Sequence, residues 1–112
     1  MKVAYVAGPY RAPTLHQIIE NIRSAEAVAI LLWGMGYAVI CPHTNTACFD
    51  GTAPDEVWLE GDLEILRRCD LLVTVSGWER SEGATKEVRE AHDCLIPVYH
   101  WAEDEELLRE DA

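Results

Sequence analysis

The chain has 112 residues, of which 49% are hydrophobic, and its 9 Lys and Arg against 20 Asp and Glu give a formal net charge of −11. This length fits one domain with one core, and the apolar content excludes a globally disordered chain. The acidic excess argues against nucleic acids and anionic membranes as partners, because both are bound through Lys and Arg.

The first third of the chain predicts a strand, a helix and a second strand. Residues 2–8 form an apolar run that stops at the turn signal Gly8-Pro9, which indicates a buried strand. Apolar residues then recur at spacings of three and four, which predicts a helix capped by Thr14 and ended by Gly34 and Gly36. Residues 37–41 form the second short strand, closed by a proline.

The rest of the chain alternates between helical and extended patterns. The expected elements are an irregular stretch at 42–53, a helix at 54–68, a strand at 70–76, a loop at 77–82, a helix at 83–93 and a strand at 96–101. Pro97 places the last strand at an edge of the sheet or at a bulge. Residues 1–102 are expected to form the domain, followed by an acidic tail at 103–112 that either folds into a short helix through Leu107 and Leu108 or frays.

Alternating strands and helices predict an α/β fold with parallel strands joined by right-handed crossovers. We expect a flavodoxin-like or Rossmann-like three-layer sandwich with a four- or five-stranded parallel sheet. In such sheets ligands bind beyond the carboxyl ends of the strands. Polar and aromatic residues gather at these ends, namely Tyr10, His43, Asn45, Trp78 and His100.

Two acidic residues interrupt apolar helix faces near this edge. Glu87 lies between Ala84 and Ala91, three and four residues away, and therefore shares their inward face. Asp62 interrupts the apolar arc of the preceding helix in the same way. A charge in such a place is costly unless it is used or paired, so each acid is either a functional group or the partner of a Lys or Arg. Paired carboxylates of this kind act on glycosidic bonds.

Four segments in this order resemble the nucleoside 2-deoxyribosyltransferase superfamily, which includes the deoxynucleoside monophosphate N-glycosidases. The segments are Val6-Ala-Gly-Pro-Tyr10, Cys41-Pro-His-Thr-Asn45, Asp62 to Val73, and Gly77-Trp-Glu-x-Ser-x-Gly-Ala-x-x-Glu87-x-x-x-Ala91. The chain is most similar to the small bacterial and phage branch. The resemblance implies cleavage of the N-glycosidic bond of a 2-deoxynucleoside or its monophosphate through a glycosyl-enzyme intermediate, with transfer to a base or hydrolysis left open.

The resemblance also implies roles for single residues. Glu87, in a Gly-x-x-x-Glu setting that begins at Gly83, matches the nucleophile, and Asp62 matches a second acid that contacts the sugar or assists protonation of the base. Tyr10 lies near the residue that orients the nucleophile. Ser81 matches the 5′-phosphate position, although its acidic neighbours Glu79 and Glu82 favour a free nucleoside.

The remaining expected substrate contacts are Gly8, Pro9, His43, Asn45 and Trp78. For His43 and Asn45 the alternative is capping of the loop, and for Trp78 and Tyr10 it is packing. No metal ligand spacing is present, and the Gly8-Pro9 turn lacks dinucleotide and P-loop signatures, so we expect no cofactor. The alternative function is a non-catalytic nucleotide-binding module of the same fold, or an interaction protein that uses its acidic surface.

No leader-like or spanning segment is evident, which predicts a cytoplasmic protein. Its four cysteines lack a zinc or disulfide pattern and are expected to be reduced structural thiols, with a catalytic thiol as the alternative. The resemblance implies a homo-oligomer.

Overall fold

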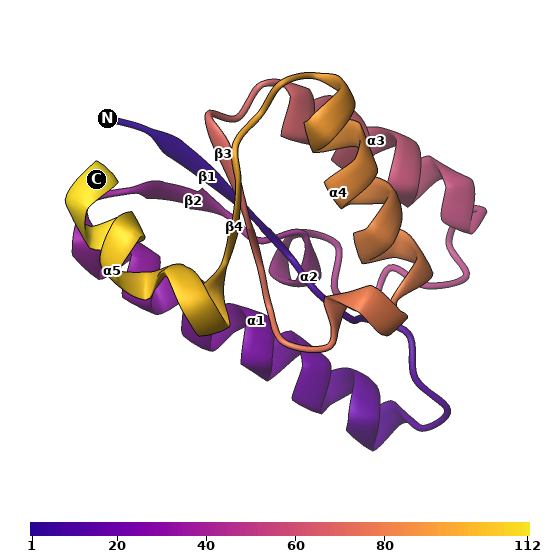
Figure 1. The fold of residues 1–112 in the computed structure, drawn as a ribbon. Helices are drawn as coiled ribbons and strands as arrows, with labels where there is room; N and C mark the ends of the chain where they lie inside the picture. Colours follow the sequence, from indigo (N-terminus) through magenta and orange to yellow (C-terminus); the bar gives the residue numbers. More distant parts are fainter.

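Four parallel strands form the central sheet of the computed structural model, which describes residues 1–112 (Figure 1). The strands are β1 (Val3–Ala7), β2 (Ala38–Ile40), β3 (Leu71–Thr74) and β4 (Val98–His100), in the order β2-β1-β3-β4. In register, Ala4 of β1 lies between Val39 and Leu71. The expected α/β fold with a four-stranded parallel sheet is confirmed, and β4, which follows Pro97, is an edge strand.

Helices cover both faces of the sheet, which makes the three layers of a flavodoxin-like fold. The helices are α1 (Leu15–Met35), α2 (Pro42–Asn45), α3 (Asp55–Arg67), α4 (Glu82–Asp93) and α5 (Trp101–Asp111). Helices α1 and α5 lie on one face, and α3 and α4 lie on the other (Figure 1). No helix is both long enough and apolar enough to span a membrane.

The side chains of β1 alternate between two cores because successive residues of a strand point to opposite faces. Ala4 and Val6 pack with the buried residues of α1, whereas Tyr5 and Ala7 pack with those of α3 and α4. Burial on both faces explains why this central strand reads as a continuous apolar run.

The residues that the sequence predicts at the two ends of α1 largely have those roles in the structure. The hydroxyl of Thr14 accepts a hydrogen bond from the backbone N–H of Gln17, and the Gln17 side chain accepts one in return from the backbone of Thr14. The helix ends at Gly36, whose φ of 106° is in the left-handed region. Gly34 lies inside the helix and does not end it.

Three local expectations differ from the structure. The stretch 42–53 is not wholly irregular, because Pro42 begins the one-turn helix α2, and a short 3-10 helix, η1 (Trp78–Arg80), lies in the expected loop at 77–82. The three- and four-residue spacing that places Ala84, Val88 and Ala91 on the inward face predicts Leu95 there too, but Leu95 is 91% exposed because the chain turns at this residue, with a φ of 58°, after α4 ends.

The C-terminal acidic residues form α5 and do not fray. Leu108 of this helix is fully buried in the core cluster that also contains α1. The hydroxyl of Tyr37 donates a hydrogen bond to the Leu108 carbonyl at 2.5 Å, which fastens α5 to the body of the domain.

Candidate active site

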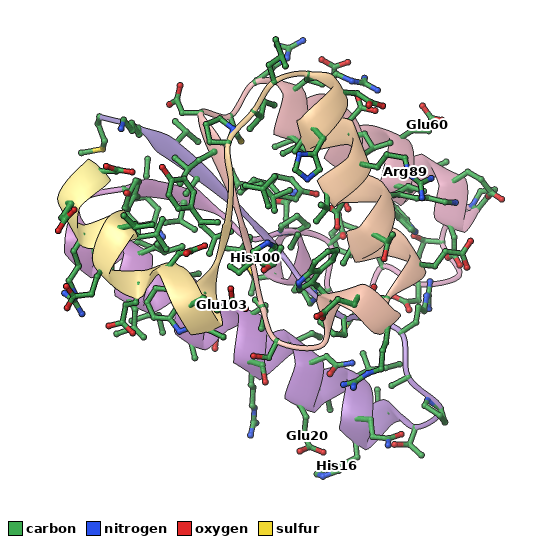
Figure 2. The ribbon with its side chains drawn as sticks, viewed as in Figure 1. His16, Glu20, Glu60, Arg89, His100 and Glu103 are labelled. Carbon is green, nitrogen blue, oxygen red and sulfur yellow. The ribbon has the colours of Figure 1, made fainter.

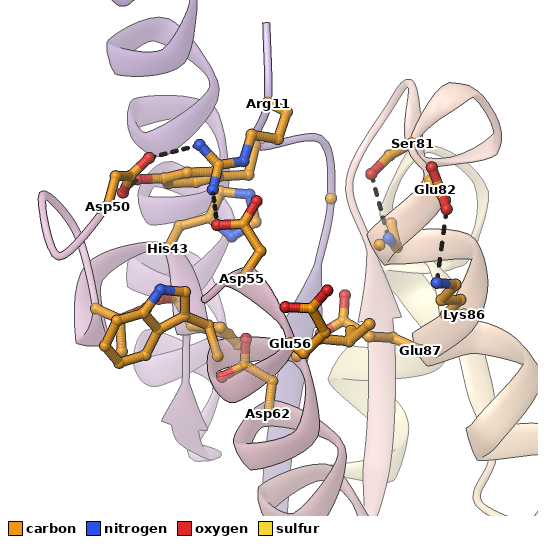
Figure 3. A pocket seen from close by; sticks show the side chains of 18 of the residues that line it. Arg11, His43, Asp50, Asp55, Glu56, Asp62, Ser81, Glu82, Lys86 and Glu87 are labelled. Atoms are coloured by element: carbon orange, nitrogen blue, oxygen red, sulfur yellow. Dashed lines mark hydrogen bonds and ion pairs between the residues drawn. The ribbon is translucent and has the colours of Figure 1, made fainter. Parts of the chain in front are cut away.

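A cavity of about 450 Å³ lies beyond the carboxyl end of β1 (Figure 3). The chain leaves β1 on one side for β2 and returns on the other as β3, so the cavity lies at the switch point where such folds bind ligands. Seven of the residues expected at the site line it: Gly8, Tyr10, His43, Asp62, Ser81, Gly83 and Glu87. A Cβ atom on Gly8 would lie 2.9 Å from Cβ of Val75, so only glycine lets the chain pass here.

The other three expected contacts do not line this cavity. Pro9 turns its carbonyl toward Nε2 of His43 at 2.7 Å, and Asn45 is exposed at the end of α2. Trp78 stacks on His100 with ring centroids 5.4 Å apart, beside a separate hollow at the ends of β3 and β4. His100 and Glu103 of that hollow are labelled in Figure 2.

Glu87 is a buried acid without a cationic partner. Its side chain projects from α4, it is 7% exposed, and it forms no ion pair. The hydroxyl of Tyr5 donates a hydrogen bond to Oε2 of Glu87. Burial, reinforced by the charge of Asp62, raises the pKa of Glu87 to about 8, and the hydrogen bond from Tyr5 acts in the opposite direction. The alternative of a Glu87–Lys or Glu87–Arg pair is therefore not what the fold contains.

Asp62, which is half-buried, is another of the six acidic residues that line the cavity. It lies on α3, which packs beside α4, and it too forms no ion pair or hydrogen bond to a Lys or Arg. Burial raises the pKa of Asp62 to about 6. Figure 3 shows Asp62 and Glu87 on neighbouring helices that border the same space. Burial of both groups, and the charge of Asp62 acting on Glu87, keep a proton on the pair over a pH range in which an exposed acid has lost it.

Tyr10 contacts Asp50 and not Glu87. Its hydroxyl donates a hydrogen bond to Oδ1 of Asp50 at 2.9 Å. Arg11 pairs with Asp50 and Asp55, both at 2.6 Å, and so connects the loop after β1 to the loop before α3 (Figure 3). The tyrosine that contacts Glu87 is Tyr5, whose place in the apolar run 2–8 indicates only a buried strand residue. The sequence does contain a signal for this contact, because the hydroxyl of a tyrosine in a buried aliphatic strand needs a hydrogen-bond partner.

His43 is a buried neutral donor at the cavity wall. A carbonyl oxygen only accepts hydrogen bonds, so the contact with Pro9 places the proton of the neutral ring on Nε2. Burial lowers the pKa of His43, which favours that neutral form. Its ring also packs edge-on against Tyr10, with centroids 5.5 Å apart. His43 therefore holds the loop after β1 in place while it lines the site.

Two cationic residues near the start of α4 belong to the site although the sequence pattern does not predict them there. Arg80 and Lys86 line the cavity beside Ser81. The hydroxyl of Ser81 caps α4 by accepting from the Ala84 N–H at 3.1 Å, and Lys86 pairs with Glu82 at 3.5 Å. Arg80 forms no ion pair, so its charge is available to a ligand.

The comparisons with known proteins place the fold and the family. The family described as "Domain of unknown function (DUF4406)" matches residues 2–100. The chain belongs to this family. A comparison with curated proteins finds no match.

A solved structure gives the second finding. The 2-deoxyribosyltransferase from the psychrotolerant bacterium Bacillus psychrosaccharolyticus is similar to this chain with a TM-score of 0.63 and 18% sequence identity. The similarity covers 88% of this chain and 70% of that one. At this level of identity the similarity shows a shared fold.

Proposed function

We propose that this protein cleaves the N-glycosidic bond of a 2-deoxynucleoside or its monophosphate, as a nucleoside 2-deoxyribosyltransferase or N-glycosidase. The observation that carries the proposal is Glu87, a buried acid that has no cationic partner and lies with Asp62 on the main cavity. The shared fold with a 2-deoxyribosyltransferase and the sequence segments around Glu87 support the same assignment.

In this proposal Glu87 is the nucleophile and Asp62 is the acid. Ionised Glu87 attacks the anomeric carbon of the sugar, the bond from that carbon to the base nitrogen breaks, and its electron pair leaves with the base. Asp62 donates a proton to the departing base. A water molecule or a second base then attacks the same carbon and releases Glu87 from the glycosyl ester, with Asp62 taking up the proton.

The pair must first place its charge on Glu87. The pKa values of about 8 for Glu87 and about 6 for Asp62 leave the proton on Glu87 and the charge on Asp62 at pH 7, so this proton moves to Asp62 before Glu87 attacks in its ionised form. The hydrogen bond from Tyr5 stabilises that ionised form. Tyr5 is therefore a positioning residue in this mechanism, and Gly8, His43 and Gly83 shape the cavity around the substrate.

The 5′-phosphate question depends on the start of α4. Arg80, Lys86 and Ser81 favour a phosphate there, whereas Glu82 opposes it. A comparison of each deoxynucleoside with its 5′-monophosphate, using wild type and Arg80→Gln, decides between them. A monophosphate substrate loses affinity in Arg80→Gln and the free nucleoside does not.

The proposal is tested by base release. Wild type, Glu87→Ala and the matched control Glu90→Ala are incubated with a panel of deoxynucleosides and monophosphates, with and without a second base. Glu90 lies on the same helix and pairs with Arg67 away from the cavity. We expect release by wild type and Glu90→Ala and none by Glu87→Ala. Absence of release from every substrate, or equal release by Glu87→Ala, contradicts the proposal; thermal stabilisation by a nucleotide without turnover would identify a binding module.

A further inference from the structure

The charged residues that line the cavity are unequally paired. Six are acidic and three are cationic: Asp50, Asp55, Glu56, Asp62, Glu82, Glu87, Arg11, Arg80 and Lys86. Two of the three cations already have partners within the chain. Arg11 pairs with Asp50 and Asp55, both at 2.6 Å. Lys86 pairs with Glu82 at 3.5 Å. Most of the positive charge of the lining is therefore already neutralised.

The other three acids of the lining have no cationic partner. They are Glu56, Asp62 and Glu87. Figure 3 shows Glu56 and Glu87 projecting toward the same space from α3 and α4. Carboxyl groups that share a space disfavour one another's charge, and a positive charge between them removes this cost. The lining therefore favours a ligand that brings a positive charge.

Glu87 is the second, independent observation that indicates such a ligand. It is 7% exposed, and only Oε2 of its carboxyl group has a hydrogen-bond partner in the chain, the hydroxyl of Tyr5. A buried acid without a cationic partner is costly in its charged form. Burial raises the pKa of Glu87, and a positive charge bound beside it lowers that pKa again. A cationic ligand would therefore favour the ionised form of Glu87.

The unpaired acids of α3 and the cations of the lining come from different elements. Arg80 belongs to η1 and Lys86 to α4, whereas Glu56 and Asp62 belong to α3. Figure 3 shows Lys86 and Asp62 on different sides of the space. The sugar end of a nucleoside, with any 5′-phosphate, fits the side of η1 and α4, and the base fits the side of α3. Arg80 therefore does not oppose a positive base.

Helix α3 also supplies an aromatic ring beside its acids. Trp58 lies between Glu56 and Asp62 in the sequence, lines the cavity and packs edge-on against Phe49, with ring centroids 5.7 Å apart. The face of an indole ring attracts a positive charge. The net charge of −11 adds the same preference at longer range.

We propose that the cavity selects a 2-deoxynucleoside whose base carries a positive charge, such as a purine alkylated at a ring nitrogen. The inference rests on the proposed function for the nucleoside and adds the charge of its base. The unpaired acids of α3 and Glu87 supply the opposite charge.

A positive base also simplifies the cleavage. Glu87 forms a bond to the anomeric carbon, the bond from that carbon to the base nitrogen breaks, and its electron pair neutralises the base. The base then leaves without taking up a proton, whereas a neutral base needs one from Asp62. Water attacks the anomeric carbon in the second step, gives a proton to Asp62 and releases the carboxylate of Glu87.

Dissociation constants test this selectivity separately from the reaction. Calorimetry at pH 7 uses the Glu87→Gln variant, which lacks the proposed nucleophile. It compares 1-methyl-2′-deoxyadenosine, whose base is cationic at this pH, with neutral 2′-deoxyadenosine. We expect the cationic nucleoside to bind about tenfold more tightly, and added salt to weaken its binding more than that of the neutral one.

Glu56→Gln in the same background shows whether charge or shape causes the preference. We expect it to raise the dissociation constant of 1-methyl-2′-deoxyadenosine about threefold and to leave that of 2′-deoxyadenosine unchanged. Glu60→Gln is the matched control, because it removes the same charge one turn further along α3, where Glu60 is exposed and lies outside the cavity lining (Figure 2). It changes neither constant. Circular dichroism melting confirms that each variant is folded.

Equal binding of the two nucleosides, tighter binding of 2′-deoxyadenosine or no binding of either overturns the inference. Equal effects of Glu56→Gln and Glu60→Gln on the cationic nucleoside overturn it as well. Failure of the proposed function is distinguishable, because base release is measured with wild type and binding with Glu87→Gln. A wild type that releases no base, together with a Glu87→Gln variant that prefers the cationic nucleoside, contradicts the reaction and supports the selectivity.

Discussion

The hydroxyl of Tyr5, in the middle of β1, donates a hydrogen bond to Oε2 of Glu87 on α4. Both side chains are buried, so the contact connects the centre of the sheet to the wall of the cavity. Burial and the charge of Asp62 raise the pKa of Glu87, whereas the Tyr5 hydroxyl lowers it. The ionisation of the proposed nucleophile is thus a balance between these groups.

Tyr5→Phe removes the one hydrogen bond that lowers the pKa of Glu87. We expect the pH profile of base release to shift to higher pH and the rate at pH 7 to fall about tenfold, since a hydrogen bond to a charged group contributes about 1.5–3 kcal/mol. The measurement is kcat/KM from pH 6 to 9.5. Tyr99→Phe is the control, because the Tyr99 hydroxyl contacts Asp111 at 2.6 Å and does not line the cavity. An unchanged profile in Tyr5→Phe would show that the contact does not govern Glu87.

Glu87→Gln makes the domain more stable at alkaline pH. The pKa of Glu87 is raised from 4.5 to about 8, so between these values the folded chain holds a proton that the unfolded chain has lost. The stability of wild type therefore falls as pH rises through this window. The substituted glutamine side chain stays neutral and avoids the loss, which predicts a gain of about 1–3 kcal/mol at pH 9 and none near pH 4.

Denaturant unfolding from pH 4 to pH 9 measures this difference. Glu90→Gln is the control: the hydrogen bond from Arg67 lowers the pKa of Glu90, so its removal gives no gain with rising pH. A Glu87→Gln variant that is less stable than wild type at pH 9 would contradict the expected burial of a neutral acid.

The parallel sheet and the two inward acids were predictable because their signals are local. The spacing of hydrophobic residues identified the helices and strands. Glu87 stood out because the residues three positions before it and four positions after it are alanines. Pro97 correctly indicated an edge strand. These inferences need only the spacing of residues within one element.

The contacts of the site were less predictable because they join distant parts of the chain. Tyr5 and Glu87 are 82 residues apart, so no local pattern indicates that the strand tyrosine reaches the helix acid. Tyr10 is closer to the expected position in the sequence, but its hydroxyl turns to Asp50. Arg80 was visible beside Ser81, yet only the turn of η1 brings it to the cavity.

Arg11→Gln loosens the rim of the cavity with little effect on stability. Arg11 is 55% exposed in its side chain, and such ion pairs contribute at most about 1 kcal/mol. The same residue holds the loop that carries Asp50 to the start of α3, so we expect KM to rise severalfold while kcat changes less. Steady-state kinetics and thermal melting separate the two effects. Arg109→Gln, which breaks an ion pair on α5, leaves both constants unchanged; an equal rise of KM in both variants would exclude a role at the rim.

Leu108→Ala tests whether the acidic residues 103–112 belong to the folded domain. Leu108 is fully buried in the core cluster with α1, so its truncation leaves a cavity and lowers the free energy of unfolding by about 2–5 kcal/mol. Leu107→Ala is the control, because the adjacent side chain is 50% exposed and its removal costs less than about 1 kcal/mol. Urea unfolding at one pH compares the two. Equal, small losses would mean that α5 contributes nothing to the core and that residues 103–112 behave as a tail. A large loss confined to Leu108→Ala would make α5 part of the domain that positions β4.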